Sequence, residues 1–481
     1  MTERLIGIET EYAISCAAIG TIRKDLVFDL LQLAKERLAY FPDLGEGLFL
    51  GNGSKLYVDY GTHPELATPE CATPWEVVRY ILAGERILTR LISELQANGY
   101  YGNEISLYKC NVDYTSALTT WGCHESYLHR MNQAELCRQI IPHLVSRIIY
   151  TGAGGFNSHS PGLEFTLSPR VPHLTQVTSS HSTSDRAIFH TKDEPLAQAG
   201  YHRLHLICGE SLCSETSMWL KVATTALVVA MAEAGLQIGN AVELVAPLQA
   251  MQDFASDPQG KATAELARRR RMTAIEIQRH YLGRAEAHMH DSFMPGWAEQ
   301  ACRKWRAILD RLESGSEGVK TTLDWAIKLA LYADFARRQG IEWGLDGKGL
   351  RLDDLYKFRR VRKQLFEIDT RFGQLTGGGV FNELARSGVL DHEVPGIGDV
   401  ERAMTDPPET GRARLRGQLI KRLARRRGDY QCDWHVVWDA RRELSLDLTD
   451  PFVSEEKWRK PNEIEQAIVF DSYEFPDHVA W

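Results

Sequence analysis

Residues 4–12 read RLIGIETEY, and this short stretch decides what kind of sheet the chain forms. Ile6 and Ile8 fall on one face of an extended chain, whereas Glu9 and Glu11 fall on the other. This follows because successive side chains of a β-strand point to opposite faces of the sheet. The stretch therefore predicts a half-buried strand whose open face carries two carboxylates.

A second strand with the same alternation is predicted at residues 55–60, which read KLYVDY. It follows the residues GNGS at 51–54, and an Asn-Gly pair between two extended runs is a strong hairpin signal. Lys55, Tyr57 and Asp59 share one face of this strand. If the two strands neighbour each other, several carboxylates converge on one face of the sheet. Four further polar residues follow closely, namely His63, Glu65, Thr68 and Glu70.

This concentration of acidic groups has two interpretations. Like charges that pack together raise each other's pKa unless a cation neutralises them, and clusters of oxygen ligands suit Mg²⁺, which often also holds substrate phosphates. The alternation also fits the solvated polar face of a half-buried sheet, and the residues alone leave this choice open. In a further predicted strand Arg203 and His205 share one face, where Arg203 is a candidate contact for an anion.

The 481 residues divide into a sheet-rich first part, a helical middle and a smaller C-terminal unit. The residues VPGIG at 394–398 mark a break before this last unit. Within it we predict a helix at 411–427 and strands at 432–438 and 443–447. We therefore expect an α+β protein with one domain over residues 1–399 and a small domain with a tail over residues 400–481.

Composition excludes several classes of protein. Lys and Arg number 56 against 64 Asp and Glu, and the net charge of −8 argues against a general nucleic-acid binder. The nine cysteines form no Cys-x-x-Cys pair, which argues against a disulfide framework and favours a reducing cytoplasm. The N-terminus has no signal-peptide pattern, and the apolar run at 222–232 is too short to span a bilayer. The glycine-rich patterns that cradle phosphates are absent from the sequence.

Two features of the C-terminal unit have both a structural and a functional interpretation. Trp434 is either a core aromatic residue or a ring that stacks on a purine base. The arginine-rich stretch at 412–427 is either a solvated helix face or a surface that contacts phosphates or an acidic protein partner.

The order of these motifs resembles the family of Pup ligases and Pup deamidases or depupylases (proteasome accessory factor A-like proteins), relatives of glutamine synthetase and γ-glutamyl-cysteine ligase. The resemblance spans about residues 4–452. It is nearer the ligase branch, because the segment between Cys16 and Phe49 is too short for the long loop of the depupylases. The matching motifs are RLIGIETEY at 4–12, NGSKLYVDYGTHPE at 52–65, GCHE at 122–125, DEP at 193–195, RLH at 203–205, PPET at 407–410, DW at 433–434 and DPF at 450–452.

The resemblance implies a glutamine-synthetase-like fold, in which a curved antiparallel sheet forms a cradle, helices cover its outer face and a small C-terminal domain caps the nucleotide end. It implies Mg²⁺ binding by Glu9, Tyr57 and Glu65, with Asp59 as the catalytic base. The ATP-site residues that it implies are Lys55, which replaces an arginine of the family pattern, together with Thr68, Trp434 and Arg203. Further neighbours in the cradle would be Glu11, Glu70 and Glu125.

The activity implied by the resemblance is that of an ATP- and Mg²⁺-dependent carboxylate–amine ligase in the cytoplasm. ATP would phosphorylate the C-terminal glutamate side chain of Pup, a small ubiquitin-like protein, and a lysine of a target protein would then form an isopeptide bond. The expected partners are a Pup-like protein and lysine-bearing proteins, with no nucleic acid and no membrane. Two alternatives stay open: a diverged paralogue that hydrolyses a nucleotide or an amide without conjugating protein, and an ATP-binding regulatory protein.

Overall fold

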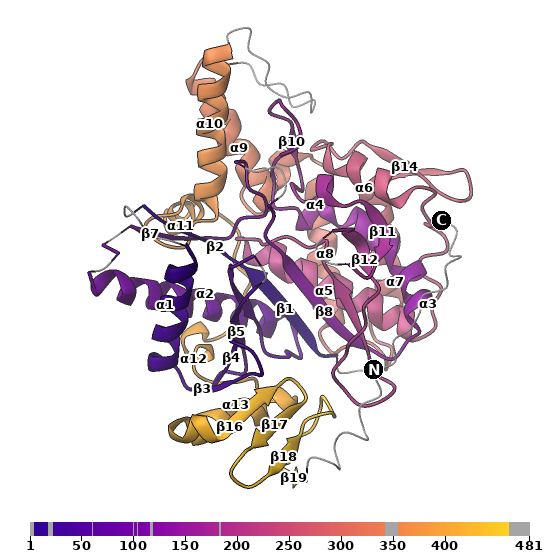
Figure 1. Ribbon diagram of the computed structural model, residues 1–481. Helices are drawn as coiled ribbons and strands as arrows, with labels where there is room; N and C mark the ends of the chain where they lie inside the picture. Colours follow the sequence, from indigo (N-terminus) through magenta and orange to yellow (C-terminus); the bar gives the residue numbers. More distant parts are fainter. Residues whose placement is uncertain are drawn as a thin grey trace.

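A nine-stranded sheet forms the centre of the computed structural model (Figure 1). The structure describes residues 4–17, 23–59, 61–99, 101–102, 104–115, 119–181, 184–341 and 355–460. The strand order is β11-β12-β13-β8-β1-β6-β5-β4-β3. Every neighbouring pair is antiparallel except β11 and β12, which run parallel. The strands are β1 Ile6–Glu11, β3 Tyr40–Pro42, β4 Leu48–Leu50, β5 Lys55–Val58, β6 Pro64–Ala67, β8 Cys123–His129, β11 Gln176–Ser179, β12 Ala187–His190 and β13 His202–Leu206.

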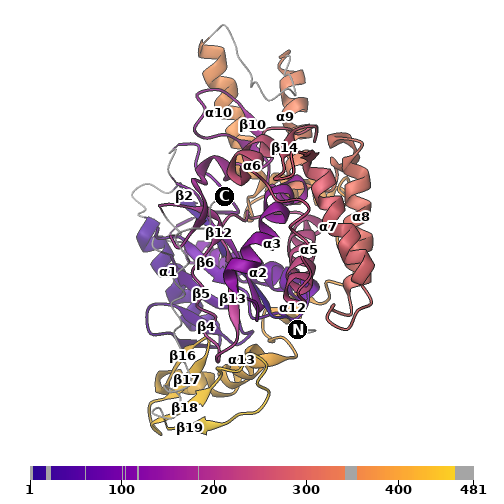
Figure 2. The same cartoon turned by 90° about the vertical axis from the view of Figure 1, so that its right-hand side faces the viewer.

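Helices cover one face of this sheet, so that the opposite face stays open (Figures 1 and 2). Helix α2 packs on β1, α5 on β8, and α3 on β12. The helices are α1 Arg23–Arg37, α2 Pro74–Ala97, α3 Gln133–Ser146, α4 Ile148–Thr151, α5 Glu215–Glu233, α6 Pro247–Ala255, α7 Ala274–His288, α8 Ala298–Leu312, α9 Asp324–Arg338, α10 Leu355–Phe372, α11 Val380–Arg386, α12 Val400–Ala403 and α13 Gly411–Leu423. None of the described helices combines the length and apolar character needed to cross a bilayer.

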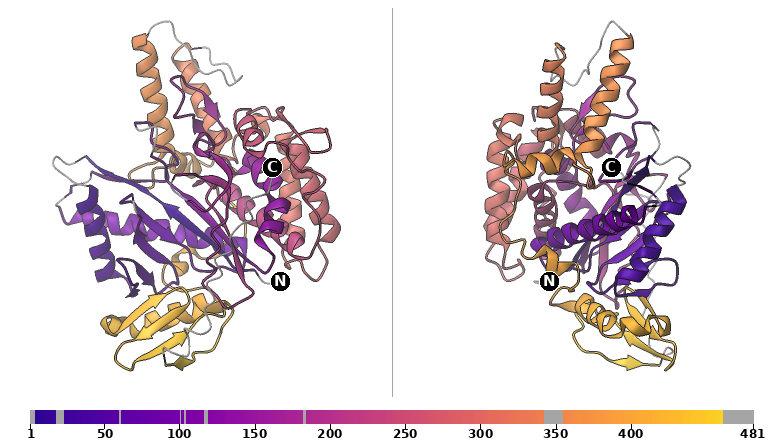
Figure 3. Two further views of the ribbon diagram at one scale, coloured as in Figure 1. Left: turned by 45° about the vertical axis from the view of Figure 1, so that its right-hand side comes forward. Right: turned by 90° about the vertical axis from the view of Figure 1, so that its left-hand side faces the viewer.

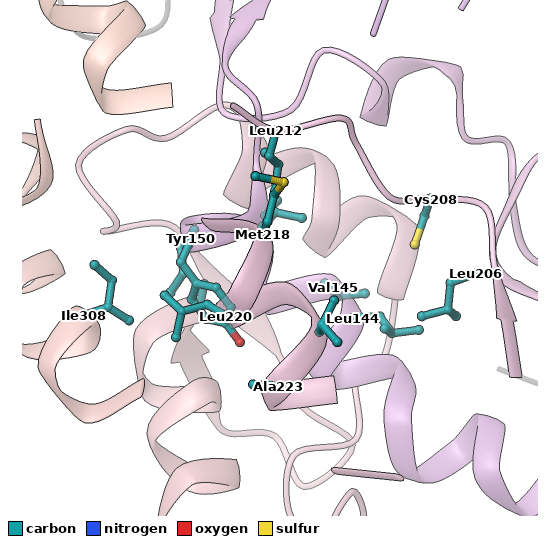
Figure 4. Packing of buried hydrophobic residues seen from close by; sticks show 14 of the residues in the cluster. Leu144, Val145, Tyr150, Leu206, Cys208, Leu212, Met218, Leu220, Ala223 and Ile308 are labelled. Atoms are coloured by element: carbon teal, nitrogen blue, oxygen red, sulfur yellow. The ribbon is translucent and has the colours of Figure 1, made fainter. Parts of the chain in front are cut away.

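The covered face of the sheet and helix α5 form the main core. Ile6 and Ile8 of β1 are buried on this face, as their alternation predicts. Helix α5 is buried along nearly its whole length, and Figure 4 shows its residue Leu220 beside Tyr150 of α4. A helix that is apolar on all sides requires this enclosed position.

Three short two-stranded sheets accompany the main sheet among the described residues. They pair residues near the chain's loops and do not extend the nine-stranded order. Their strands are β2 Ala13–Cys16 with β7 Ile105–Tyr108, β9 Gly155–Phe156 with β10 Phe165–Thr166, and β14 Thr263–Glu265 with β15 Arg271–Thr273.

The C-terminal unit consists of α13 and a four-stranded antiparallel sheet at one end of the molecule, drawn in yellow in Figures 1 and 3. Its strands are β16 Tyr430–Asp433, β17 Val436–Asp439, β18 Leu444–Asp447 and β19 Trp458–Arg459. The single strand predicted at 432–438 is wrong, because the chain turns at Trp434 and His435 and pairs β16 with β17. The predicted domain boundary at residue 400 stays a prediction. Helix α12, which begins there, still contacts α2 of the main part. Residues 461–481 of the predicted tail lie outside the described residues.

A buried group of three charges joins this unit to the main sheet. Glu70 follows β6, and its carboxylate accepts hydrogen bonds from Arg412 Nε at 2.6 Å and Arg416 Nη2 at 2.5 Å. Arg416 is fully buried. Burial alone would raise the pKa of Glu70, but the charges of Arg416 and Arg412 outweigh it and lower the pKa to about 2. These two arginines therefore do not belong to a solvated helix face.

We expect Glu70→Gln to destabilise the chain strongly, because the substitution leaves two buried guanidinium groups without a carboxylate. Removing one partner of a buried ionic group costs about 3–5 kcal/mol. Urea denaturation followed by tryptophan fluorescence measures the loss. The matched control is Glu401→Gln, which removes two exposed ion pairs, to Arg86 and Arg90, and should change the unfolding free energy by less than about 1 kcal/mol.

The same interaction predicts a pH dependence. A carboxyl whose pKa is lowered on folding stabilises the folded state above its unfolded pKa, near roughly 4.3, and this stabilisation is lost as the pH falls through the folded value. For Glu70 that folded value is about 2. The stability difference between the parent and Glu70→Gln should therefore narrow between about pH 5 and pH 2. A difference that stays constant over this range would contradict the assignment.

Candidate functional site

The strand register brings the predicted acidic residues together on the open face of the sheet. In the antiparallel pairing Tyr57 of β5 lies opposite Glu65 of β6, and Glu65 lies opposite Glu11 of β1. Directly paired residues of neighbouring strands place their side chains on the same face. Glu9 lies on this face as well, two residues before Glu11. The predicted convergence of carboxylates is thus present in the fold.

Strands β8 and β13 extend this face with basic groups. His124 is paired with Glu9 in the register, and its Nδ1 lies 3.3 Å from the Glu9 carboxylate. Arg203 donates to Ser126 Oγ at 3.0 Å and lies 3.3 Å from Glu9. His205 stands beside His124 with ring centroids 5.3 Å apart. Arg203 therefore joins the site, and His124 is a site residue whose motif the sequence showed without indicating its role.

The charges on this face are unevenly balanced. Burial alone would raise the pKa of Glu9, but the hydrogen bond with His124 and the charge of Arg203 outweigh it and lower the pKa to about 2. Burial and the negative charges of Glu9 and Glu11 raise the pKa of Glu65 well above its usual range. Burial and the charges of Glu9 and Glu65 likewise raise the pKa of Tyr57. The face therefore has more negative charge than its own cations neutralise.

A hard divalent cation fits this arrangement. Glu65 is only 5% exposed, so its carboxylate needs a partner. Among the described residues no cationic side chain forms an ion pair with it. Glu9, Tyr57 and Glu65 offer oxygen ligands only, which is the donor set that Mg²⁺ prefers. Two further groups, Glu9 with His124 and His205, and Glu11 with Asp59 and His63, bring potential ligand atoms within 4.8 Å of one another.

Asp59 lies just beyond the end of β5 and is held by a tight turn. Its carboxylate accepts from the backbone N–H of His63 at 2.6 Å and lies 2.9 Å from His63 Nδ1. The His63 ring in turn packs against Trp121, with ring centroids 5.5 Å apart. The predicted base therefore has a fixed orientation beside Glu11, and His63 is the residue that orients it.

A cavity lies between the open face and the C-terminal unit. Glu9, Thr68 and Arg203 line it from the sheet, and Arg412 and Trp434 line it from the C-terminal unit. The Trp434 ring packs edge-on against Phe49 at 5.1 Å, and its other contacts include the Arg416 guanidinium at 4.9 Å. Because Trp434 is only half-buried, one part of its indole remains available to the cavity.

A short loop borders the same cavity and is fixed at both ends. The Asp193 carboxylate accepts from the Arg203 backbone N–H at 2.6 Å, and the Leu196 carbonyl accepts from Arg412 Nη1 at 2.5 Å. Glu194 and Leu196 have backbone φ values of 42° and 46°, which residues other than glycine rarely adopt. Such strain persists only where the surroundings hold the backbone, and it is concentrated at functional sites.

The two remaining predicted contacts are Lys55 and Thr68, of which only Thr68 lines the cavity. Lys55 Nζ forms an ion pair with Asp43 at 2.8 Å and stands over the rings of Phe49 and Tyr57. The Thr68 hydroxyl lines the cavity and accepts from the Ile8 backbone N–H at 3.0 Å. Asp43 was not identified from the sequence, because nothing near it suggests a pairing across the hairpin.

One expected neighbour does not belong to the cradle. Glu125 points to the helix-covered face, where it is fully buried and forms a two-pronged ion pair with Arg147 at 2.6 and 2.8 Å. The reason is the strand period: His124 occupies the open face, so the next residue must face the core. The GCHE motif therefore contributes its histidine to the site and its glutamate to the core.

The chain is similar to known proteins along nearly its full length. The Pup-ligase protein family model matches residues 4–438. The chain belongs to this family. Curated Pup–protein ligases of Sanguibacter keddieii and Kribbella flavida are each 34% identical to it, over 94% and 95% of this chain and 97% and 98% of their own.

Solved structures of a Pup ligase show the same fold. One is the complex between Pup and its ligase PafA, with a TM-score of 0.78 and 28% identity over 97% of this chain and 92% of the other. A second is PafA in complex with ADP, with a TM-score of 0.72 and 28% identity over 94% and 95% of the two chains. The expected fold class is thereby confirmed.

We expect Glu65→Gln to stabilise the cation-free chain and to abolish its response to Mg²⁺. Because the pKa of Glu65 is raised on folding, its ionisation opposes folding at any pH above the unfolded value, near roughly 4.3. Removing that charge should raise the melting temperature at pH 7.5 by about 2 °C. Mg²⁺ should raise the melting temperature of the parent but not of the variant, as differential scanning fluorimetry measures.

The matched control is Glu243→Gln, which removes an exposed glutamate and should alter neither melting temperature. A Glu65→Gln chain that melts below the parent without cation would show that this carboxylate holds the fold together instead of opposing it.

Proposed function

We propose that this chain is an ATP-dependent ligase that joins the C-terminal glutamate of Pup to lysine side chains of proteins. One observation carries the proposal: the open sheet face gathers an acidic cluster beside a cavity capped by Trp434, in a chain that matches Pup ligases along nearly its full length. The relatives' names and the solved PafA complexes with Pup and with ADP support the substrate and the nucleotide.

The acidic cluster provides the metal site of this proposal. Glu9, Tyr57 and Glu65 hold Mg²⁺ through their oxygen atoms. Bound Mg²⁺ offsets the negative charge of the phosphoryl group that is transferred. His124 and Arg203 keep Glu9 ionised, since they lower its pKa to about 2, and so maintain it as a ligand at every physiological pH.

The cavity provides the nucleotide site. The half-buried indole of Trp434 contacts the base, and Thr68 donates its hydroxyl proton to a phosphate oxygen. Arg203 and Lys55 supply positive charge to the phosphates; Lys55 exchanges its partner Asp43 for an anion when it does so. A lysine binds phosphate as a point charge and lacks the two-pronged geometry of arginine.

Asp59 provides the base. A lysine ammonium has a pKa near roughly 10.4, so it must lose a proton before it attacks an acyl phosphate at neutral pH. The carboxylate of Asp59, held in place by His63 just beyond the C-terminal end of β5, accepts this proton. The nitrogen then forms the isopeptide bond as phosphate leaves.

The cellular setting stays a prediction. We propose a cytoplasmic location, and the nine cysteines support it because all are free, as they would be in a reducing compartment.

We expect Asp59→Asn to bind ATP and to lose conjugation. Asparagine keeps the size of the side chain and the hydrogen bond from the His63 backbone but cannot accept a proton, so turnover should fall by about 10²–10⁴, the usual contribution of a general base. The assay mixes the enzyme with Mg²⁺, ATP, a Pup protein ending in glutamate and a lysine-bearing protein. Conjugation appears as a mass increase of the acceptor.

The control for this assay is Asp291→Asn, an exposed position that follows α7 on the helix-covered side of the sheet. Full activity of Asp59→Asn would remove the base assignment. A parent chain that hydrolyses ATP in an Asp59-dependent way without forming a conjugate would support the paralogue alternative and overturn the ligase proposal.

We expect Trp434→Ala to weaken ATP binding while the chain stays folded, because the half-buried ring contributes more to the cavity than to the core. Base–aromatic contacts contribute about 1–3 kcal/mol, so the dissociation constant measured by calorimetry should rise at least fivefold. Trp305→Ala provides the contrast: this ring is fully buried in the core, and its loss costs about 3–5 kcal/mol of stability. A Trp434→Ala chain that melts much earlier but binds ATP normally would make Trp434 a core residue.

A further inference from the structure

Helix α10 carries a concentrated positive charge that the ligase chemistry does not use. Residues 357–363 read KFRRVRK, and no acidic residue occurs between 355 and 366. We call Arg359, Arg360 and Lys363 the basic arm. Together with α9, helix α10 projects beyond the sheet at the end of the molecule opposite the C-terminal unit (Figures 1 and 3).

The basic arm occupies the outer face of α10. Arg359, Arg360 and Lys363 are exposed, whereas Val361 and Leu365 on the other face are buried. These two sets follow from the helical period, since residues three and four apart share a face. The three cations therefore lie side by side on a surface that faces solvent.

This grouping opposes the stability of the helix. Arg359 and Lys363 are four residues apart and Arg360 and Lys363 three apart, so like charges are neighbours on the same face. Among the ion pairs that join described residues, none involves these three side chains, whereas Arg337 and Arg338 at the end of α9 both pair with Asp334. A local feature that opposes folding without an internal compensation indicates a function.

The C-terminal half of α10, which follows the basic arm, is held by contacts with neighbouring segments. The Tyr114 ring stacks on Phe366 with centroids 4.1 Å apart, and its hydroxyl donates to Asp369 at 2.8 Å. The buried Asp369 also forms an ion pair with Lys328 of α9 at 2.8 Å. Helix α10 is thus fixed on the segment of chain that contains Tyr114.

Described contacts connect that segment to the Asp59 end of the cradle. Val112, before Tyr114, forms a β-bridge with Thr120. Trp121 then packs on His63, and the N–H of Gly122 donates to Glu11 at 2.8 Å. Strand β5 starts at Lys55, close to Phe49 and the C-terminal unit, and runs away from them toward Asp59. The arm therefore stands on the side where an amine reaches Asp59, and the nucleotide cavity lies on the other side.

We propose that the basic arm docks folded acceptor proteins through acidic patches on their surfaces; this inference rests on the proposed ligase function. The occupant must present a lysine at the Asp59 end, and a carboxylate-bearing surface complements the unpaired cations beside that entrance. A nucleic acid fits less well, because the chain has a net charge of −8 and the neighbouring cradle is acidic. Charges at the rim of an interface act mainly on encounter and orientation, so the arm changes capture of the acceptor and leaves the chemical step unaltered.

The test compares two amine acceptors with the charge-reversed chain Arg359→Glu/Lys363→Glu. One acceptor is a folded, acidic, lysine-bearing protein, and the other is Nα-acetyl-lysine. We expect the KM for the protein to rise about tenfold at low salt, and the effect to vanish at about 0.5 M salt, where exposed charges are screened. The kcat, the KM for Pup and the rate with Nα-acetyl-lysine should change by less than about twofold.

A matched control and a milder variant isolate the role of the arm. Arg268→Glu/Arg270→Glu reverses two exposed arginines in the turn between β14 and β15, away from the cradle, and should leave every parameter unchanged. Arg360→Gln removes one charge without reversing it and should raise the KM for the acidic protein by a smaller factor. Replacing surface aspartates of the acceptor by asparagine should abolish the difference between parent and variant.

Several outcomes would overturn the proposal. An unchanged KM for the acidic protein shows that the arm has no role in docking, and a raised KM for Pup alone assigns the arm to the tag. Salt-sensitive binding of duplex DNA that the variant loses, with normal acceptor kinetics, assigns it to nucleic acid. If the parent conjugates neither amine, the ligase function itself fails. Fluorescence anisotropy of the labelled acidic protein then tests the arm separately, because equal affinity for parent and variant rules docking out.

Discussion

The structure depends on one electrostatic constraint: several ionisable oxygens are held on a single face of an antiparallel sheet. The pairing of β5, β6 and β1 sets Tyr57, Glu65 and Glu11 in a row, and Glu9 lies beside them. Burial of Glu65 and the repulsion from Glu9 and Glu11 raise its pKa, so ionisation of this carboxyl opposes folding. The core on the other face of the sheet supplies the stability that holds them there. A face that is repulsive in the free chain is preorganised to bind a cation.

The polar groups around this row divide the site into three regions. His124 and Arg203 stabilise the charge of Glu9, and the half-buried Trp434 closes the cavity at one end. His63 fixes Asp59 just beyond the end of β5, and under the proposed function a nucleotide and an amine would approach the site from different ends. The buried interaction of Glu70 with Arg412 and Arg416 then couples the cavity to the C-terminal unit, since Arg412 also holds the loop at Leu196. The same two arginines therefore contribute both to the stability of the C-terminal unit and to the shape of the cavity.

Local patterns predicted much of the fold. The alternation in residues 4–12 and the Asn-Gly hairpin both appear where the pattern predicts them, because each depends on neighbours within a few residues. The turn at Trp434 was missed, since residues on both sides of it have equal strand character and only the pairing of β16 with β17 separates them. The prediction that Glu125 lies in the cradle was wrong, because the GCHE motif identifies an acidic residue without indicating which face of the sheet its side chain occupies.

The sequence by itself determined which residues could form a site: their types, their spacing, and a resemblance carried by motifs in one order from residue 4 to residue 452. It also determined the alternation that places Glu9 and Glu11 on one face, because a strand's period is a local property. Only the tertiary structure decided that the Trp121 ring packs on His63 beside Asp59, that Asp43 pairs with Lys55 and that Arg412 and Arg416 turn inward to Glu70. The physical reason is that these interactions join side chains brought together by strand register and domain packing, which depend on the whole chain.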